Sequence, residues 1–332
     1  MLSYILVDAA NMFFRARHVV RGSDMKTKIG MSYHIIFNSI NKVWREQKGT
    51  HVVLCLEGRS WRKDAYEPYK RNRAEARSAL TDQEKTEDEE FWQAFDELQD
   101  FFKNKTNCTV LQNKDCEADD FIARWIHNHP NDKHCIVSSD SDFYQLIKEN
   151  VTQYNGIMGQ LITHEGIYDD NGKPIIDKKT KEPKKIESPE WILFEKCIRG
   201  DTSDNIFSAF PGARKKGTKN KVGMMEAFAD KDAKGFNWNN FMLQRWVDHE
   251  NVEHRVLDDY QRNMQLIDLN AQPDEIKQKL DSAIVEQVQK QPKSQVGIHF
   301  MKFCGKWDMQ RVSDKAQDHS QYLNSSYASA NA

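Results

Sequence analysis

The sequence predicts an α/β protein with a mostly parallel sheet flanked by helices, followed by a smaller helical domain. In the first half of the chain, short apolar runs typical of buried strands alternate with longer stretches of helical periodicity. From Glu190 onward the pattern is helical. A length of 332 residues suits two domains.

The alternation of strands and helices begins at the N-terminus. We expect strands at Tyr4–Val7, His51–Leu56, Cys108–Leu111 and His134–Ser139, and a further strand pair at Thr152–Tyr154 and Gly159–Thr163. We expect helices at Ala10–Val19, Ser32–Gln47, Glu89–Lys105 and Glu117–His129, and a short one that ends at Ile147. This order favours parallel strands joined by helices that cover both faces of the sheet.

The second half of the chain begins with a change in composition. Asp169–Pro189 is Lys-rich and contains three prolines, so we expect a loop near a domain boundary. Helices are expected at Trp191–Ile198, Lys221–Ala229, Phe241–His249 and Glu253–Leu269. Residues 315–332 lack apolar periodicity and are expected to be a flexible tail. The predicted domains are therefore 1–188, with a basic arch at about 58–90, and 189–314.

Composition limits the kind of protein this can be. The formal net charge is −2, so any surface for a polyanion must be local. The six cysteines include no C-x-x-C pair and are expected to be buried, reduced thiols, which suits the cytoplasm. Leu2–Val7 is too short and too poor in basic flanking residues for a signal peptide, and no run approaches the ~20 apolar residues of a membrane helix. We therefore expect a cytoplasmic protein with no membrane partner.

Acidic residues recur where the predicted strands end. Ligands gather at the carboxyl ends of parallel strands, and Asp8, Glu57 and Asp140 each follow a strand. Further acids occur in the sequences C-E-A-D-D, S-D-S-D and G-D-T-S-D-N, as Glu117, Asp119, Asp120, Asp142, Asp201 and Asp204. Each acid alone fits a turn, a helix cap or a first helical turn. Their joint recurrence favours metal binding.

Converging carboxylates repel one another, and hard divalent cations relieve that repulsion. Ligand sets made only of oxygen suit Mg²⁺ or Mn²⁺. A pair of such ions would support displacement at phosphorus, because one ion lowers the pKa of the attacking water and the other stabilises the leaving oxygen. The acids therefore predict a metal-dependent reaction on a phosphodiester.

Two basic stretches accompany the acids. Residues 59–77 carry seven Lys or Arg against three acids, with Trp61, Tyr66 and Tyr69 between them. Cations hold phosphates and aromatic rings stack on bases, so this mixture suits single-stranded nucleic acid. Residues 211–221 carry five cations and no acid, and suit a duplex backbone. Either stretch could instead be a solvated surface. The acid-rich stretch 82–90 is expected to be only the solvated start of a helix.

In this order, the motifs resemble the 5′ nuclease (flap endonuclease) family, and most closely its bacteriophage ribonuclease H members. The motifs are Asp8, Glu57 with W-R-K and Y-K-R-N-R after it, C-E-A-D-D, S-D-S-D-F-Y-Q-L and G-D-T-S-D-N. The resemblance reaches to about Asp314. It implies a PIN-like nuclease domain and a helical domain with a helix–three-turn–helix element. It also implies removal of RNA primers and flaps from 5′ ends during lagging-strand replication.

The resemblance also assigns roles to residues. First-metal positions match Asp8, Glu57, Asp120 and Asp140, with Glu117 and Asp119 in the same network, and second-metal positions match Asp142, Asp201 and Asp204. Catalytic positions of the arch match Lys70, Arg62, Arg73 and Tyr69. Together with the basic stretches, it suggests nucleic-acid contacts at Arg15, Lys63, Arg71, Arg77, Arg214, Lys215, Lys216, Lys219 and Lys221. Two Mg²⁺ ions are implied, with a third as an option and Mn²⁺ as a substitute.

Two departures from the family pattern stand out. Glu57 occupies a position where the family usually has Asp, and the Gly-x-Gly hairpin of the helix–three-turn–helix is replaced by N-I-F-S-A-F-P-G-A-R-K-K-G-T. Family members of phage origin work with a single-strand-binding protein and a sliding clamp, so these are the implied partners of an expected monomer. A non-catalytic junction-binding protein, or a phosphatase that uses the D-x-D of Asp140 and Asp142, is the alternative function.

Overall fold

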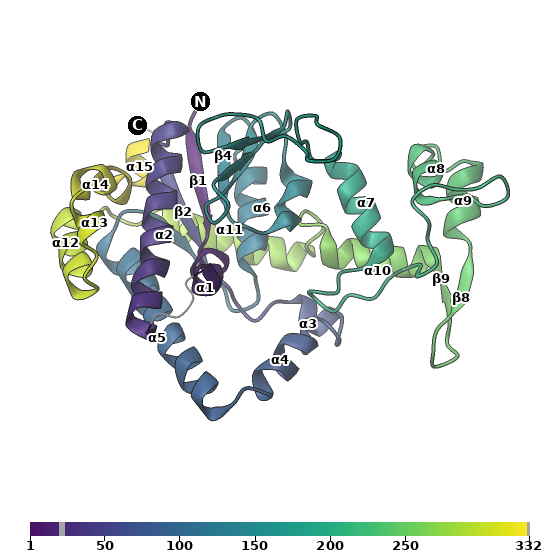
Figure 1. Ribbon diagram of the computed structural model, residues 1–332, viewed down its shortest axis with the longest axis horizontal. Helices are drawn as coiled ribbons and strands as arrows, with labels where there is room; N and C mark the ends of the chain where they lie inside the picture. The colour runs from purple at the N-terminus through teal and green to yellow at the C-terminus, as the bar shows by residue number, and fades with distance from the viewer. Residues whose placement is uncertain (20–23, 331–332) are drawn as a thin grey trace. The chain divides into compact units, whose positions relative to one another are not determined.

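The computed structural model describes residues 1–19 and 24–330 (Figure 1). For residues 16–19 it describes the backbone alone. The chain forms two compact units. Unit 1 comprises Met1–Ser60, Leu80–Ile186 and Asp274–Ala332, and unit 2 comprises Trp61–Ala79 and Glu187–Pro273. These boundaries differ from the predicted division at residue 188. Residues 61–79 of the predicted first domain fold with unit 2, and the chain from Asp274 onward, predicted in the second domain and the tail, folds with unit 1.

Unit 1 is built on a seven-stranded sheet in the order β3-β2-β1-β4-β5-β6-β7. The strands are β1 (Ser3–Asp8), β2 (His51–Cys55), β3 (Thr109–Leu111), β4 (Lys133–Val137), β5 (Val151–Asn155), β6 (Gln160–Ile162) and β7 (Ile167–Asp169). Strands β1 to β5 pair in parallel, and β6 runs antiparallel to both of its neighbours, β5 and β7. The predicted α/β class with a mostly parallel sheet is confirmed.

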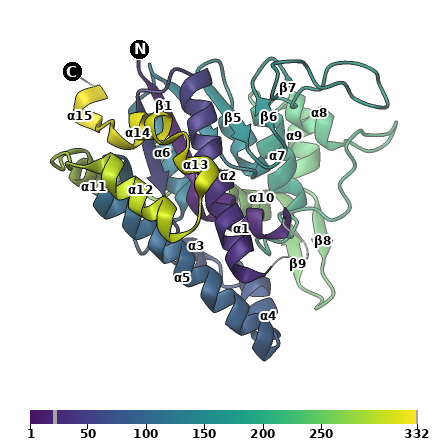
Figure 2. The same ribbon diagram turned by 60° about the vertical axis from the view of Figure 1, so that its left-hand side comes forward.

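Helices cover the sheet of unit 1 on both faces (Figure 2). One face packs against helices that include α1 (Ala9–Val19), α2 (Met25–Glu46), α5 (Asp82–Lys105), α12 (Val296–Lys306), α13 (Gln310–Ser313) and α14 (Ala316–Asn324). The other face packs against α6 (Ala118–Asn128) and α11 (Asp274–Val288). Side chains along β1 point alternately to the two faces of the sheet. Ile5 and Val7 therefore pack in the core that contains α2, whereas the Tyr4 ring contacts Trp125 of α6 on the other face.

The C-terminal segment is not the flexible tail that composition suggests. Helix α14 places Tyr322 and Leu323 in the core of unit 1 with no exposed surface, and α15 (Tyr327–Ala330) follows it. The amide of Asn107 donates to the carbonyl of Leu323 at 2.8 Å, which fixes this segment beside β3. Two large buried side chains suffice to hold a short polar helix, although its sequence shows no extended periodicity.

The Lys-rich stretch after β7 also has more structure than a loop. The amide of Ile175 donates to the Ile167 carbonyl at 2.8 Å, and the amide of Ile167 donates to the Lys184 carbonyl at 3.0 Å. The stretch therefore folds back as a hairpin along the edge strand of the sheet. Such cover blunts an otherwise open strand edge.

Unit 2 contains α3 (Arg62–Ala65), α4 (Arg71–Ser78), α7 (Pro189–Arg199), α8 (Met224–Ala229), α9 (Phe236–Met242) and α10 (Val256–Ile267). Trp191, Phe194, Met224 and Phe241 form its main core. A second core joins Tyr69 to Cys197, Ile206 and Leu266. The predicted arch at about 58–90 is thus divided, because residues 61–79 fold with unit 2 and Thr81 caps the start of α5 in unit 1.

One predicted helix of unit 2 is partly wrong. Phe241–His249 contains the end of α9 and then the strand β8 (Arg245–Val247), which pairs with β9 (Glu253–Arg255). The ring of Trp246 stacks on His254 with centroids 4.5 Å apart, and Asp248 closes the turn by accepting from the amides of Glu250 and Val252. Cross-strand stacking and turn chemistry here override a short helical pattern.

Three buried histidines predict how the stability of unit 1 depends on pH. Burial lowers the pKa of His51, His134 and His319 to about 4. Unfolded histidine titrates near 6.5, so between these values the unfolded chain binds more protons and the free energy of unfolding falls as pH falls. Each histidine contributes at most about 3 kcal/mol to this loss.

Urea unfolding measured from pH 7 to pH 4 checks this expectation. His319→Phe is expected to reduce the loss of stability across that range, because it removes one of the three groups. His249→Gln, at a side chain that is 90% exposed, is the control and is expected to leave the pH dependence unchanged. An equal fall with pH in wild type and His319→Phe would show that other groups cause it.

Candidate active site

The acids of unit 1 lie at the carboxyl edge of the parallel strands. Asp8 is the last residue of β1, Glu57 follows β2 and Asp140 follows β4. The chain passes from β1 outward to β2 and β3, and then returns to the opposite side of β1 as β4. This reversal of strand order is the place where open α/β sheets bind ligands.

Strand register and alternation bring these acids together. Asp8 pairs with Cys55, and Val7 pairs with Val137, so Ser138 lies beside Asp8. Asp8 shares the face of Tyr4 and Leu6, which is the face that α6 covers. The acidic N-terminus of α6 therefore lies on the same side of the sheet as Asp8.

Ser138 connects the acids of β1 and β4. Its hydroxyl donates to Asp8 Oδ2 at 2.8 Å and accepts from the amide of Asp140 at 3.1 Å. The carboxylate of Asp140 caps the 3₁₀ helix η1 (Ser141–Leu146), since its Oδ1 accepts from the amide of Asp142 at 3.0 Å. The side-chain amide of Gln153, in β5, donates to the carbonyls of Ser138 and Asp140 and fixes the loop between β4 and η1. These bonds hold each carboxylate in one orientation.

Glu57 lies in the loop after β2, and this loop is hydrogen-bonded to the segment between β3 and α6. Gly58 donates its amide to the Cys116 carbonyl at 2.8 Å, and Arg59 donates to the Lys114 carbonyl at 2.7 Å. The Glu57 carboxylate is exposed, and its Oε2 accepts from the amide of Ala118 at 3.4 Å. The longer side chain at this position therefore still reaches the start of α6.

The close approach at Gly58 leads to a testable prediction. An added Cβ would lie 2.2 Å from the Asn113 carbonyl oxygen and 2.6 Å from that of Cys116, which requires the loop to move. Gly58→Ala is expected to lower the free energy of unfolding by about 1–3 kcal/mol and to displace Glu57. Gly305→Ala in α12 is the control, since no atom lies within 4 Å of its added Cβ. Thermal unfolding of both variants measures the difference.

Three further carboxylates open helix α6. Oxygen atoms of Glu117, Asp119 and Asp120 lie within 4.8 Å of one another, and Glu117 and Asp120 are buried. The carboxylate of Asp120 accepts from the Glu117 amide at 3.0 Å, and the Ser60 hydroxyl donates to Glu117 Oε2 at 2.7 Å. The N-terminus of the helix adds a favourable field for the negative charges.

The electrostatics of unit 1 show where the carboxylates converge. Burial raises the pKa of the Cys55 thiol well above its usual value, and the negative charges of Asp8, Glu57 and Asp119 raise it further. Carboxylates at the end of β1, in the loop after β2 and in α6 thus act on the thiol at the end of β2. Their ligand atoms are all oxygens, so the cluster has the chemistry that holds a hard divalent cation.

Asp201 and Asp204 lie in unit 2, after α7. Burial acts to raise the pKa of Asp201, but the Lys196 ammonium 2.7 Å away and the hydroxyl and amide of Ser203 outweigh it, so the pKa is lowered overall. Asp201 therefore stays ionised and is paired with a lysine of its own unit.

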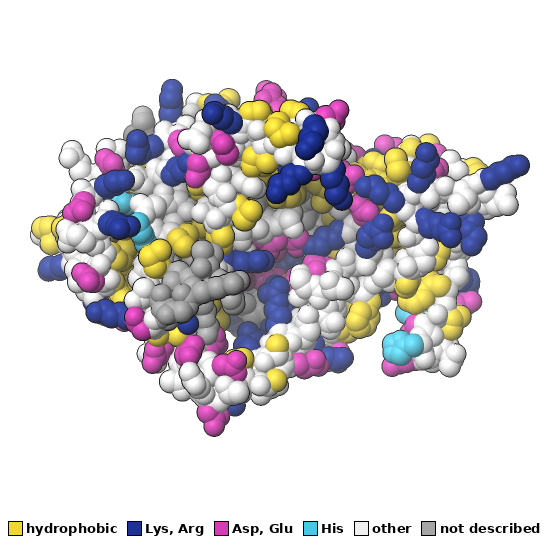
Figure 3. All heavy atoms as spheres, in the orientation of Figure 1, with side chains coloured by type: hydrophobic (Ala, Val, Ile, Leu, Met, Phe, Trp, Pro, Cys, Tyr) yellow, Lys and Arg dark blue, Asp and Glu magenta, His cyan; other side chains and the backbone are white. Residues whose placement is uncertain are grey.

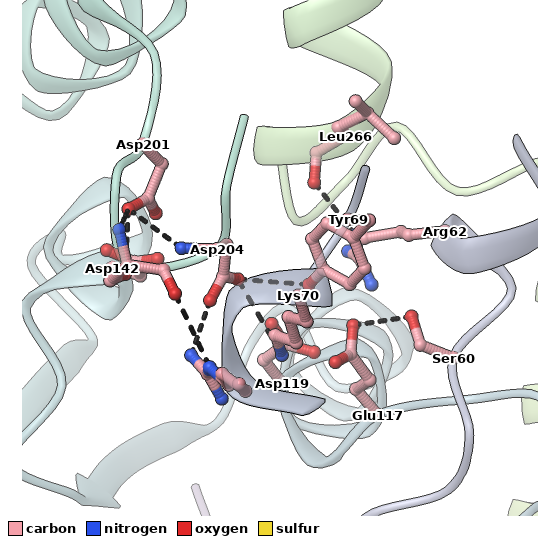
Figure 4. A network of polar contacts seen from close by, with 12 residues as sticks. Ser60, Arg62, Tyr69, Lys70, Glu117, Asp119, Asp142, Asp201, Asp204 and Leu266 are labelled. Atoms are coloured by element: carbon pink, nitrogen blue, oxygen red, sulfur yellow. Dashed lines mark hydrogen bonds and ion pairs between the residues drawn. The ribbon is translucent and has the colours of Figure 1, made fainter. Parts of the chain in front are cut away.

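Asp204 is surrounded by the basic segment, which we define as residues 61–79 (Figure 4). The Tyr69 hydroxyl donates to Asp204 Oδ2 at 3.0 Å, and Lys70 Nζ lies 3.6 Å from the same oxygen. The Arg73 guanidinium forms an ion pair with Asp204 Oδ1. The predicted catalytic residues Lys70, Tyr69 and Arg73 are thus brought together on one carboxylate.

Arg62, expected among the catalytic residues of the arch, is buried. Its side chain is 1% exposed, its Nε donates to the Leu266 carbonyl at 2.8 Å, and its guanidinium lies over the Trp61 ring. The Leu266 carbonyl belongs to the last turn of α10, where cations are favoured. Arg62 therefore anchors the basic segment to α10 within unit 2.

The remaining predicted nucleic-acid contacts occupy various settings. Arg15 is exposed on α1, Lys63 is half-buried, Arg71 pairs with Glu67 and Arg77 is exposed. Lys215 pairs with Glu187, whereas Arg214, Lys216, Lys219 and Lys221 are exposed. Figure 3 shows Lys and Arg side chains gathered over the end of unit 2 that carries α8 and α9.

Four residues that orient or neutralise the acids were not predicted from the sequence. Ser60, Ser138 and Gln153 bond to the carboxylates or to their loop, and Lys196 neutralises Asp201. Ser138 had a local signal, because it lies two residues before an acid at a strand end. Ser60 and Gln153 had none, since their partners are distant in the chain.

Residues 3–173 match the family described as the 5′-3′ exonuclease N-terminal resolvase-like domain, which is just over half of the chain. The chain belongs to this 5′-3′ exonuclease family. The matched residues include every acid of unit 1 that the sequence singled out. The resemblance seen in the sequence is therefore confirmed.

Relatives of the 5′-3′ exonuclease chain include polymerases and nucleases. It is 25% identical over 264 residues to DNA polymerase I of Rhizobium leguminosarum, and 27% identical over 206 residues to the flap endonuclease of Escherichia phage T5. These alignments cover 75% and 61% of this chain, but 22% and 63% of the relatives. The chain thus spans less than two-thirds of either relative.

Solved structures support the same fold. T5 5′-exonuclease with bound zinc has a TM-score of 0.56 at 18% identity, covering 86% of this chain and 99% of that one. A T5 flap endonuclease complex with DNA and metal ions also has a TM-score of 0.56 at 18% identity, with coverage of 87% and 100%.

Among the described residues of this family member, no helix is long and apolar enough to span a lipid bilayer.

Proposed function

We propose that this protein is a divalent-metal-dependent 5′→3′ exonuclease and flap endonuclease that hydrolyses phosphodiester bonds at 5′ ends. The observation that carries the proposal is the placement of Asp8 and Glu57 at the switch point of the unit 1 sheet, where the Glu57 carboxylate accepts from the amide that begins α6 and its acid cluster. Membership of the 5′-3′ exonuclease family and a fold shared with T5 flap endonuclease support it.

The all-oxygen donor set of unit 1 fits a divalent cation, and Mg²⁺ is the ion we expect. Asp8, Glu57, Asp120 and Asp140 would hold it, with Glu117, Asp119 and Asp142 in the surrounding shell. When bound, such an ion lowers the pKa of a water and stabilises charge on phosphate oxygens. Ser138, Ser60 and Gln153 orient the carboxylates before any ion arrives, which limits the reorganisation that binding requires.

The basic residues have separate tasks in this proposal. Lys70 would face the negative charge that develops on the scissile phosphate, where a preorganised cation stabilises the transition state. Arg214, Lys216, Lys219 and Lys221 would contact the duplex backbone behind the cleavage point. Removal of RNA primers and flaps from lagging strands, beside a single-strand-binding protein and a sliding clamp, is the biological role we infer from the family resemblance.

The test is cleavage of duplexes that carry a 5′ flap, a 3′ flap or neither, labelled at either end, in Mg²⁺ and in EDTA. We expect metal-dependent release of short 5′ products from the 5′-flap substrate, and no cut in the 3′ flap. Tight flap binding without cleavage in Mg²⁺ or Mn²⁺ would indicate a non-catalytic junction-binding protein. Release of inorganic phosphate from a small phosphoester instead would indicate a phosphatase.

A further inference from the structure

We propose that Glu226 is a positioning residue whose carboxylate holds the basic loop of unit 2 in the shape that presents its cations to a nucleic-acid duplex. We define the basic loop as residues 214–223, which lead into helix α8. The inference rests on the proposed function for the duplex contact, whereas every bond that supports it lies within unit 2.

The Glu226 carboxylate closes the base of the basic loop. Gly217 donates its amide to Glu226 Oε2 at 3.0 Å and to Oε1 at 3.2 Å. Gly223 donates its amide to the same Oε2 at 2.9 Å. Because these two glycines flank residues 218–222, one side chain from the first turn of α8 joins both ends of the turn that the loop makes.

Close contact between the two glycines allows this closure. A Cβ added to Gly223 would lie 2.4 Å from the Gly217 nitrogen and 2.8 Å from Glu226 Oε2. A Cβ added to Gly217 would lie 2.4 Å from the Lys221 carbonyl oxygen. A larger residue at either position would therefore push the loop away from the carboxylate.

Glu226 is ionised in this setting. Burial acts to raise its pKa, but the amides of Glu226 itself, Gly217 and Gly223 and the positive charge of Lys216 outweigh it, so the pKa is lowered overall. An ionised carboxylate only accepts hydrogen bonds, and it accepts strong ones from amides. A glutamine would keep one acceptor oxygen but would place an NH₂ donor against the Gly217 amide.

The backbone that carries the cations is folded onto itself and onto α8. The Met224 amide donates to the Arg214 carbonyl at 2.9 Å, and the Thr218 amide donates to the Lys221 carbonyl at 2.8 Å. The exposed cations of the loop are Arg214, Lys216, Lys219 and Lys221. Cations on a fixed backbone lose less conformational entropy when they bind phosphates than cations on a mobile loop do.

Loss of the Glu226 carboxylate should loosen the loop without unfolding unit 2. Ala213 and Val222, near the two ends of the loop, pack against the core of unit 2, and Met224 and Ala227 of α8 belong to that core. These apolar contacts hold α8 and the ends of the loop in place. A positioning role therefore predicts weaker duplex binding with an unchanged rate of cleavage at saturating substrate.

The experiment compares Glu226→Gln and Glu226→Asp with Asp232→Asn, a control that removes a charge from unit 2 at a side chain that is 90% exposed. The measurements are affinity for a blunt duplex in EDTA, trypsin cleavage after Lys216, Lys219 and Lys221, thermal unfolding, and single-turnover cleavage of a saturating 5′ flap. For Glu226→Gln we expect affinity lowered about threefold to tenfold, faster trypsin cleavage and the wild-type rate at saturation. Glu226→Asp keeps the charge but shortens the side chain, and we expect it to weaken binding by a smaller factor.

The sign of the change separates positioning from simple electrostatics. Glu226→Gln removes a negative charge beside cations, so electrostatics alone predicts tighter duplex binding. Wild-type or tighter affinity in folded Glu226→Gln, or in Glu226→Asp if the glutamine variant does not fold, would overturn the proposal.

A combined variant tests whether Glu226 acts through the cations of the loop. In a background of Lys216→Ala, Lys219→Ala and Lys221→Ala, Glu226→Gln is expected to lower duplex affinity by about twofold or less. An undiminished effect in that background would also overturn the proposal. If the wild type binds the duplex but does not cleave the flap, the proposed function fails, and the duplex and trypsin measurements still decide the role of Glu226.

Discussion

Asp140→Asn is expected to abolish metal-dependent cleavage while leaving nucleic-acid binding intact. The Asp140 carboxylate follows β4 at the switch point of the sheet, and its backbone is fixed by Ser138 and Gln153. Asparagine keeps an oxygen to cap η1 but removes the negative charge that a cation requires. We expect a loss of at least about a hundredfold in single-turnover rate, or roughly 3 kcal/mol of activation free energy.

The measurement is a single-turnover time course in Mg²⁺, with flap affinity measured separately in EDTA. Asp96→Asn is the control, because Asp96 is exposed on α5 and its carboxylate accepts from the Gln99 amide group in the same helix. Thermal unfolding should show that Asp140→Asn remains folded. Full turnover by a folded Asp140→Asn protein would remove Asp140 from the metal site.

Lys70→Ala is expected to produce the second large effect. The ammonium is held at a fixed point by the strained backbone at Lys70 and by Asp204, so it is preorganised for charge that develops on a phosphate. We expect single-turnover cleavage to slow by about a hundredfold, or roughly 3 kcal/mol, with a much smaller change in flap affinity.

Lys70→Arg separates charge from geometry, since the guanidinium keeps the charge but has a different shape. Lys302→Ala, at an exposed lysine of α12, controls for the general loss of a cation. An unaltered single-turnover rate in Lys70→Ala would exclude Lys70 from the chemistry. A weakened affinity with the same rate at saturation would assign it to binding alone.

Much of the fold and the acidic edge could be predicted because their signals are local. An apolar run followed by an acid predicts that Asp8 and Asp140 lie at or just after the ends of strands, without any knowledge of tertiary contacts. The acids before and within α6 likewise follow from a helix N-terminus. These features depend on residues that are neighbours along the chain, so the pattern of apolar and acidic residues is enough to predict them.

Contacts between distant segments could not be predicted in the same way. The contacts of Asp204 with Tyr69 and Arg73 join it to a segment about 130 residues earlier in the chain. Arg62 was expected among the catalytic residues of the arch, and its side chain is buried, with a bond to the Leu266 carbonyl. The tail was expected to be flexible, but Tyr322 fills the core of unit 1. Each outcome was set by a tertiary partner that no local pattern specifies.

Anomalous scattering of Mn²⁺ in crystals of the wild-type protein would show most directly whether the acids of unit 1 bind metal. We expect a Mn²⁺ peak at the carboxyl edge of the unit 1 sheet, coordinated by oxygens of Asp8, Glu57, Asp120 and Asp140. A fully occupied ion bound elsewhere, with this edge empty at saturating Mn²⁺, would contradict it.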